Sequence, residues 1–369
     1  VQFSITSALI LGTLFMQQQF RYMKGQDLGF DKTRKLIVPL RGGISVRANY
    51  DDVKHAFRGG PGVRGVALSS TVPGRTVSNF AIEIVGQADN KSQSMFHLYF
   101  DEDFIPLYGI SLVAGRAFQR DLATDVEETF LINEAAVKAF GWSRPEEALG
   151  QKLRTGNGGR TLTIIGVTRD FHYRGLQAPV EPLAMEFNPG MLSYLTVEID
   201  AAGVTAARSF VERRWKDTFP GRPFESFFLD TDFDRQYQAD ERVGRIFGIF
   251  MILGLIVACL GLFGLASFAA ESRTREVGVR KILGASTSGI VVLLSRQFAV
   301  WVLAANLLAW PAAYVFVDRW LRNFAARTPI GVATFLWSGL AVLAIALLTT
   351  SLQTIRAASA NPAVSLKYE

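Results

Sequence analysis

Two histidines lie close to acidic residues, and such side chains can bind a metal ion or act as general acids and bases. His97 precedes the acidic run 101–103, and imidazole and carboxylate ligands at such a spacing could hold a divalent metal ion. A strand that ends at a solvated helix cap has the same spacing, and we favour that interpretation. His172 follows Asp170 and could serve as a general base. No nucleophile partner is visible, so we favour a turn that buries Phe171.

Nucleotide and hydrolytic chemistry require sequence motifs that this chain lacks. It has no Gly-x-x-x-x-Gly-Lys-Ser/Thr loop, no Gly-x-Ser-x-Gly elbow and no His-Glu-x-x-His pair. Residues 155–159 form a glycine-rich turn without the phosphate-binding lysine, and we expect this turn to join two strands of a hairpin. The single cysteine, Cys259, excludes an intrachain disulfide and a cysteine-based zinc site. The sequence therefore predicts no catalytic residues, no metal site and no cofactor of its own.

Composition indicates that much of the chain lies in a membrane. Of the 369 residues, 49% are hydrophobic and 20% are charged, whereas soluble domains carry about 25% charge. The low fraction of charged residues comes from four runs that lack charged side chains. These runs are long enough to span a membrane, because a helix needs roughly 20 apolar residues to cross a bilayer. The runs are 1–20, 246–270, 297–317 and 330–355. A purely soluble protein is excluded.

The first run is the weakest of the four, because Gln17, Gln18 and Gln19 lie at its end. It begins at Val1 with no basic region before it, and it has no small-residue cleavage site, so it differs from a signal peptide. We expect a transmembrane helix that is clipped at its start, in a chain that is a piece of a longer protein.

The apolar runs contain no ionisable side chain, which argues against an ion-driven transporter with a substrate site at mid-membrane. Small residues recur in the second run at a spacing that lets helices approach closely, and a dimer interface is one use of such a face. These residues are Gly254, Ala258, Gly261 and Gly264. Pro311 removes a backbone donor from the third run and predicts a kink there.

Basic residues set the orientation of the helices. The loop 271–287 is rich in Lys and Arg, and basic loops lie on the cytoplasmic side. We assign the net charge of +6 first to such loops and not to nucleic-acid binding. The loop 318–329 then lies outside although it holds three arginines. The predicted segments are helices at 1–20, 243–270, 288–317 and 330–356, an extracytoplasmic insertion at 21–242 and a cytoplasmic tail at 357–369.

The long insertion has the pattern of a mixed α/β (α+β) domain, because short β-rich runs between turn residues alternate with helical spacing. Strands are expected at 35–40, 63–69, 80–86, 161–167, 192–199 and 224–229, and helices at 50–57, 133–140 and 203–219. Asn133 can cap the helix that follows it. Residues 231–245 are polar and compatible with a helix, and we expect them to run unbroken into the second span as a stalk.

Several motifs resemble one family. Residues 264–286, GLASFAAESRTREVGVRKILGAS, closely resemble the signature of the FtsX-like/MacB-like ABC transporter permease family. Residues 355–366, IRAASANPAVSL, are similar to the C-terminal ending of that family. In the insertion, four short motifs resemble the MacB-like periplasmic core domain. They are 133–136 (NEAA), 165–167 (IGV), 170–172 (DFH) and 181–182 (EP).

The resemblance implies an α-helical membrane protein with four transmembrane helices and a large extracytoplasmic α/β domain inserted after the first. It also implies a separate or fused ABC ATP-binding subunit and a second permease unit. The loop between the second and third helices would be the coupling helix that meets the ATPase. Its residues are Arg273, Arg275, Glu276, Gly278, Arg280, Lys281, Gly284 and Ala285. The start at Val1 resembles the second half of a duplicated permease, and the absence of an ATPase domain leaves macrolide export unsupported.

The function that the resemblance implies is that of a permease subunit in the bacterial inner membrane, with ATP bound and hydrolysed by the partner. The expected mechanism is mechanotransmission, in which movement of the spans reshapes the outer domain for export or for lipoprotein or peptide handling. Two alternatives remain open. A transmembrane sensor needs an output module, and none follows the last span; an FtsX-like regulator of cell-wall hydrolases would use the same architecture.

Overall fold

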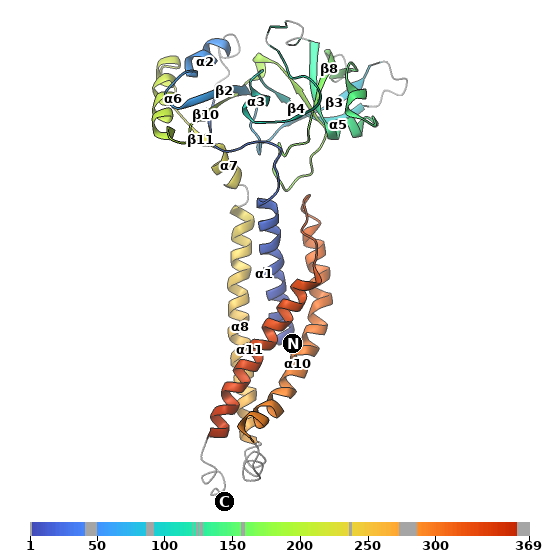
Figure 1. Ribbon diagram of the computed structural model, residues 1–369, viewed down its shortest axis with the longest axis vertical. Coiled ribbons are helices and arrows are strands. Elements are labelled where there is room, and N and C mark those ends of the chain that lie inside the picture. The colour runs from blue at the N-terminus through green and yellow to red at the C-terminus, as the bar shows by residue number, and fades with distance from the viewer. Residues whose placement is uncertain are drawn as a thin grey trace, which may run out of the picture. The chain divides into compact units, whose positions relative to one another are not determined.

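The protein is described here by a computed structural model, which covers residues 2–40, 50–85, 92–119, 121–122, 125, 128–155, 159–235, 238–272 and 286–359 (Figure 1). The chain divides into two compact units. Unit 1 comprises Val1–Gly25 and Ala239–Glu369, and unit 2 comprises Gln26–Gln238. These boundaries lie close to the limits, 21 and 242, that the sequence predicts for the insertion.

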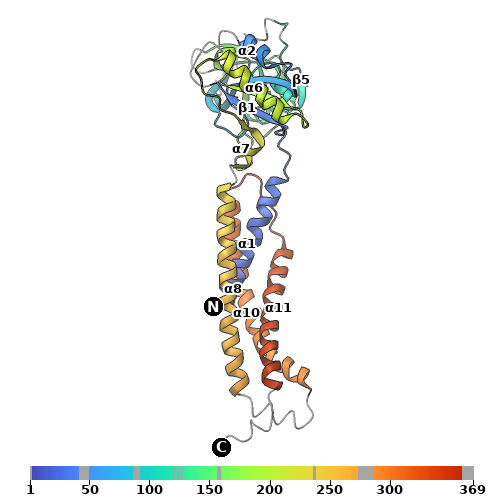
Figure 2. The same ribbon diagram turned by 90° about the vertical axis from the view of Figure 1, so that its left-hand side faces the viewer.

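Unit 1 is built from long helices that lie side by side (Figures 1 and 2). They are α1 (Gln2–Lys24), α8 (Gln238–Ser272), α10 (Thr287–Leu321) and α11 (Val332–Ser359). In the part of the chain that the structure describes, three helical stretches are long and apolar enough to cross a membrane. They are Arg242–Leu265, Ser295–Leu321 and Val332–Leu352. Helix α1 has the length of a span, but the glutamines at its end lower its hydropathy.

Helix α1 packs closely against its neighbours in unit 1. Leu11 and Phe15 are fully buried against Val317 and Phe335, and the rings of Phe15 and Phe335 lie 5.5 Å apart. The polar Ser7 is buried too, and its hydroxyl donates to Oδ1 of Asn306 at 2.7 Å. Helices in a bilayer associate through such packing and hydrogen bonds, since lipid is as apolar as their side chains.

The glutamine that ends the apolar part of α1 has a structural partner. Gln19 is fully buried; its Nε2 donates to the Ala326 carbonyl at 2.6 Å, and its Oε1 accepts from the Thr328 amide at 2.8 Å. The amide of Gln19 therefore satisfies backbone groups of the turn between α10 and α11, which would otherwise be costly to bury.

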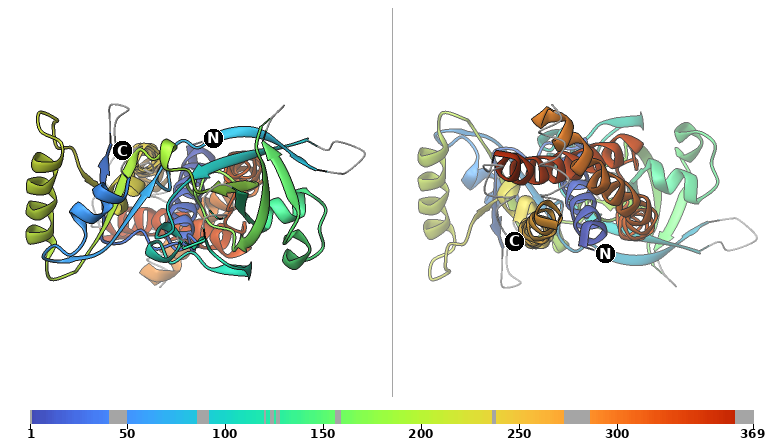
Figure 3. Two further views of the ribbon diagram at one scale, coloured as in Figure 1. Left: turned by 90° about the horizontal axis from the view of Figure 1, so that it is seen from above. Right: turned by 90° about the horizontal axis from the view of Figure 1, so that it is seen from below.

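Unit 2 contains two sheets, and the smaller one is antiparallel with helices over one face. The strand order is β11 (Phe227–Phe228), β1 (Lys35–Pro39), β10 (Tyr194–Ile199) and β2 (Val63–Ser69). Helices α2 (Tyr50–Phe57) and α6 (Val204–Thr218) pack on it through a core that includes Phe57 and Trp215. Within unit 2 these elements lie at the end opposite the second sheet (Figure 3).

The second sheet of unit 2 mixes parallel and antiparallel pairs. Its order is β5 (Leu112–Gly115), β8 (Thr161–Thr168), β6 (Thr129–Asn133), β9 (Leu183–Glu186), β4 (Ser92–Tyr99), β3 (Ser78–Ile84) and β7 (Lys152–Thr155). Strand β7 also pairs with β8, so β8-β6-β9-β4-β3-β7 form a closed ring. The short helix α5 (Glu134–Ala139) covers it through Ala136 and Val137.

All six predicted strands overlap strands of the structure, and all three predicted helices are present. Asn133 caps α5 as predicted, because its side chain accepts a hydrogen bond from the Ala136 amide. The prediction for 224–229 was too long, since only Phe227–Phe228 pair and Leu229 already begins α7 (Leu229–Arg235). The predicted stalk is helical up to Arg235 and again from Gln238, and the two residues between lie outside the described residues.

Candidate functional site

The predicted coupling residues cannot be placed, because the whole segment 273–285 lies outside the described residues. This applies to Arg273, Arg275, Glu276, Gly278, Arg280, Lys281, Gly284 and Ala285. The described chain stops at Ser272, the end of α8, and resumes at Ser286. There the Ser286 hydroxyl accepts from the Gly289 amide and caps α10. The coupling role of the eight residues remains a prediction.

The small residues predicted for helix packing lie on α8. A Cβ atom at Gly254 would lie 3.2 Å from a leucine side chain of α1, and one at Gly261 would lie 2.6 Å from a glutamine side chain of α1. Ala258 is 3% exposed, whereas a Cβ at Gly264 would meet nothing within 4 Å. Gly254 and Gly261 thus lie where α8 approaches α1 within the same chain, and a dimer interface stays a prediction.

In unit 2, the acidic run after β4 surrounds a buried lysine. Nζ of Lys54, in α2, lies 2.6 Å from Asp101, 2.8 Å from Glu102 and 2.5 Å from Asp103. The side chains of Lys54 and Asp101 are 1% and 0% exposed. Burial alone would lower the pKa of Lys54, but the three carboxylates outweigh it and raise the pKa. The prediction that the run 101–103 forms a solvated helix cap is therefore wrong, because Asp101 is buried and the run pairs with Lys54.

Asp101 organises the backbone around this lysine. Its carboxylate accepts from the Leu68 amide at 2.9 Å and from the Asp103 amide at 3.2 Å, which joins β2 to the start of α3 (Phe104–Leu107). Arg58 forms a further ion pair with Asp103. The cluster of Lys54, Arg58 and the carboxylates thus ties α2 to both β2 and α3. Ion pairing to a lysine, and not metal binding, accounts for the acidic run.

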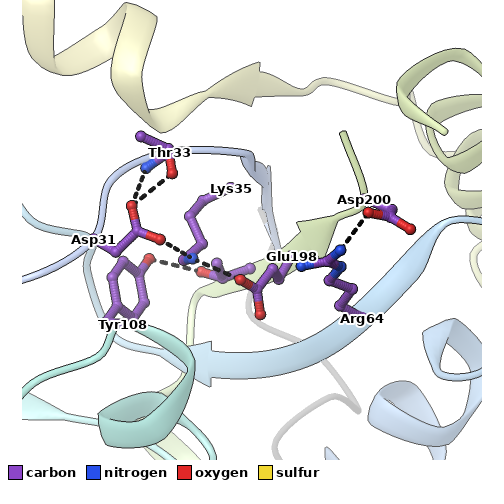
Figure 4. A network of polar contacts seen from close by, with 8 residues as sticks. Asp31, Thr33, Lys35, Arg64, Tyr108, Glu198 and Asp200 are labelled. Carbon is purple, nitrogen blue, oxygen red and sulfur yellow. Dashed lines mark hydrogen bonds and ion pairs between the residues drawn. The ribbon is translucent and has the colours of Figure 1, made fainter. Parts of the chain in front are cut away.

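A second buried lysine lies on the sheet of β1 and β10. Lys35 is fully buried, and its Nζ lies 3.2 Å from Glu198 and 3.4 Å from Asp31 (Figure 4). The hydroxyl of Tyr108 hydrogen-bonds Thr196 at 3.0 Å beside it, and burial raises the pKa of Tyr108. The network fixes α3 and the segment before β1 to the central strand β10.

Helix α7 is fixed to unit 2 immediately before the long helix α8 begins. Asp232 accepts from both Nε and Nη2 of Arg75 at 3.0 Å. The guanidinium carbon of Arg75 lies 4.2 Å from the ring centre of Phe227, and Phe233 is buried against Phe30 at 5.9 Å. A bidentate pair of this kind holds orientation as well as position. We call Arg75, Asp232 and Phe233 the α7 anchor. No local pattern in the sequence predicts it, because Arg75 and Asp232 are 157 residues apart.

Contacts within unit 2, and not a catalytic arrangement, account for the positions of His97 and His172. Nε2 of His97 lies 3.1 Å from Oε2 of Glu186, and so His97 pairs with β9 and not with the acidic run. Asp170 accepts from the Ala135 amide at the start of α5, and burial raises its pKa. Burial lowers the pKa of His172. Among the described residues, no group of three or more histidine, cysteine or acidic side chains is arranged to hold a metal ion.

The glycine-rich turn also has a structural explanation. Strands β7 and β8 pair antiparallel on either side of it, with Lys152 opposite Thr163 and Arg154 opposite Thr161. Residues 156–158 lie outside the described residues. The predicted hairpin is confirmed by the pairing of its strands.

Comparison with known families gives two matches that follow one another along the chain. Residues 3–207 match the model of the MacB-like periplasmic core domain. Residues 248–362 match the model of the FtsX-like permease C-terminal region. The first match contains most of unit 2. The second begins within the helical stretch Arg242–Leu265 and contains the other two stretches of membrane length.

Curated relatives include two proteins described as macrolide export ATP-binding/permease protein MacB. The one from Aggregatibacter actinomycetemcomitans is 24% identical over 246 residues, which are 63% of this chain and 36% of the relative. The one from Rhodopseudomonas palustris (strain BisB18) is 25% identical over 210 residues, 54% of this chain and 31% of the relative. The chain thus spans about a third of the length of these relatives.

Solved structures of outer domains are similar as well. The periplasmic region of MacB from Actinobacillus actinomycetemcomitans aligns with a TM-score of 0.41 and 17% identity, covering 56% of this chain and 94% of that one. The extracellular domain of the ABC-type transporter YknZ from Gram-positive bacteria gives a TM-score of 0.38 and 13% identity, covering 52% and 98%. The family matches, in contrast, cover more than half of the chain. The protein therefore belongs to the FtsX-like/MacB-like permease family and carries a MacB-like periplasmic core domain.

Proposed function

We propose that the chain is the permease subunit of an ABC transporter and that α1 is a fourth transmembrane helix. In this proposal unit 2 lies on the extracytoplasmic side of a bacterial inner membrane, and 271–287 lies in the cytoplasm as the coupling loop. A separate ATP-binding subunit and a second permease unit are the partners. The chain itself hydrolyses nothing, binds no cofactor, and relies on the partner to bind ATP.

One observation carries the proposal: the same chain combines three apolar helices of membrane length with a unit that matches a periplasmic core domain. The α7 anchor supports a mechanical role. It fixes α7, which ends at Arg235, and α8 starts at Gln238. In this proposal a displacement of α8 acts on α7 along the chain that connects the two helices, and ATP-driven movement of the helices is transmitted to unit 2.

Topology is tested by cysteine labelling in intact cells. In a Cys259→Ser background, a cysteine at Arg144, whose side chain is 75% exposed in unit 2, should react with an impermeant maleimide. A cysteine at Ser286 should react only after the cells are opened, because the basic loop is expected to be cytoplasmic. Labelling of the second position alone in intact cells would overturn the orientation.

If the chain is a permease subunit, ATP hydrolysis should require the ATP-binding partner. Because the sequence has no phosphate-binding loop, the purified chain should hydrolyse ATP no faster than a buffer blank. An ATP-binding subunit encoded beside it should co-purify with it and hydrolyse ATP in the complex. Turnover by the isolated chain that survives repeated purification would contradict this, and an adjacent kinase gene in place of an ATPase would favour the sensor.

A further inference from the structure

A groove of about 690 Å³ runs between α1 and α8 in unit 1. Both helices contribute to its walls. Phe20 and Met16 line it from α1, and Gly248 and Ile252 line it from α8. The groove is partly open and is not an enclosed cavity.

The groove has one polar end and one apolar end. A Cβ at Gly244 would lie 3.0 Å from Phe20, whereas a Cβ at Gly254 would lie 3.2 Å from Leu9. The two helices therefore run antiparallel, and the C-terminal end of α1 lies beside the first turns of α8. The apolar walls continue from that end toward Thr13, eight residues before Arg21, or about 12 Å along a helix.

Arg21, Lys24 and Arg245 line the polar end, and the lining residues that the structure describes include no carboxylate. Arg245 lies at the start of the apolar stretch Arg242–Leu265, which places this end at a boundary between apolar and polar surroundings. Guanidinium and ammonium groups are the usual protein ligands of phosphate oxygens. A basic end followed by apolar walls is complementary to an anionic amphiphile that lies along the helices.

We propose that this groove binds an anionic phospholipid of the outer leaflet of the membrane, with its phosphate at Arg21 and Arg245 and an acyl chain against Met16 and Ile252. The proposal rests on the membrane topology given above, in which α1 is a span. A second copy of the chain is the other occupant that a glycine-containing groove suggests. A two-fold contact through the groove would place the same cations against one another, which disfavours it.

Gly248 allows the groove to be filled without disturbing the packing of the helices. A Cβ atom at Gly248 would meet nothing within 4 Å, so a leucine there would enter open space at the groove. Gly264 lies on the same helix, and a Cβ there also meets nothing within 4 Å, but it does not line the groove. Gly264→Leu is therefore a matched control for Gly248→Leu.

The experiment is native mass spectrometry of the delipidated full-length chain, titrated with phosphatidylglycerol and, separately, with phosphatidylcholine of the same acyl chains. The wild type should bind the first phosphatidylglycerol about tenfold more tightly than phosphatidylcholine. Gly248→Leu should weaken this binding about tenfold, and the double variant Arg21→Gln/Arg245→Gln should remove the preference for phosphatidylglycerol. Gly264→Leu should bind as the wild type does.

Equal binding of the two lipids by the wild type would overturn the proposal, as would unchanged phosphatidylglycerol binding by Gly248→Leu. The same spectra report the number of chains in each particle. If Gly248→Leu converts a dimer to a monomer while lipid binding stays the same, the second copy occupies the groove and the lipid proposal is wrong. The assay needs no ATPase partner, and cysteine labelling tests the topology separately, so failure of the lipid proposal is distinguishable from failure of the proposed function.

Discussion

Replacing Lys54 with methionine is expected to destabilise unit 2 by about 3–5 kcal/mol at pH 8, the usual cost of leaving a buried charge without its partner. Methionine has similar length, so the change removes the ammonium with little change in volume. It leaves Asp101, Glu102 and Asp103 facing one another, and the Asp101 side chain is 0% exposed. Urea unfolding followed by hydrogen exchange of peptides from β2 and β4 would measure the effect in unit 2 separately from the helices.

The same variant should recover stability in acid. Burial raises the pKa of Asp101 to about 7 even though Lys54 opposes the shift. A carboxyl whose pKa is raised in the folded state takes up a proton more readily there than in the unfolded chain, so lowering the pH favours folding. Without the ammonium this effect becomes stronger. The cost of Lys54→Met should therefore be clearly smaller at pH 5 than at pH 8.

Lys152→Met is the control for this prediction, because Lys152 is an exposed lysine on β7 of the same unit. It should change stability by less than about 0.5 kcal/mol at either pH. Adding Asp101→Asn to Lys54→Met should restore part of the loss, since it removes one of the carboxylates. A loss below about 1 kcal/mol at pH 8, or no dependence on pH, would mean that water or a local rearrangement already solvates the carboxylates.

The elements that the sequence predicts well are those whose signal is local. Helix α2 (Tyr50–Phe57) and strand β2 (Val63–Ser69) have the predicted bounds, because amphipathic spacing and turn residues mark both ends. The cap at Asn133 is local too, since its acceptor and donor are three residues apart. Local chemistry of this kind can be read without knowing the fold.

Strand β9 (Leu183–Glu186) shows what such reasoning does not reach. It has four residues, all buried, and it lies between β4 on one side and β6 on the other. A run this short has no measurable periodicity, and its strand conformation depends on neighbours that are distant in sequence. The ring of strands to which it belongs could not be predicted for the same reason.

Polar residues in apolar surroundings gave the least reliable predictions. Gln19, at the end of the apolar part of α1, is buried and bonds the backbone at Ala326 and Thr328, and the sequence does not indicate these partners. The run 101–103 was expected to be solvated, yet it pairs with Lys54, some 48 residues away. A polar side chain is tolerated inside when its partners are present, and the sequence does not indicate which distant residues will be those partners.

The second large effect concerns the segment 271–287, on which the coupling hypothesis depends. Arg280→Glu is expected to abolish both co-purification with the ATP-binding subunit and ATP hydrolysis stimulated by the permease. Arginine presents a planar fork of donors that can pair with a carboxylate of the partner in bidentate fashion, and glutamate reverses the charge at that contact. Loss of one side of a desolvated ion pair at an interface costs about 2–5 kcal/mol, whereas an exposed pair contributes only about 0–1 kcal/mol. The loss of binding free energy between the two subunits therefore distinguishes a coupling helix that is buried against the partner from a solvated loop.

Arg213→Glu makes the same chemical change on the exposed surface of α6 in unit 2, and it should leave partner binding unchanged. Both variants should reach the membrane in wild-type amounts, because Arg213 is exposed on α6 and Arg280 is expected to lie in a cytoplasmic loop. A bulky side chain at Gly284 should reproduce the Arg280→Glu result by excluding the loop from a cleft without altering charge. If Arg280→Glu retains the partner and its ATPase activity, ion pairing by this loop does not couple the subunits. The route from ATP to unit 2 would then have to begin elsewhere on the cytoplasmic side.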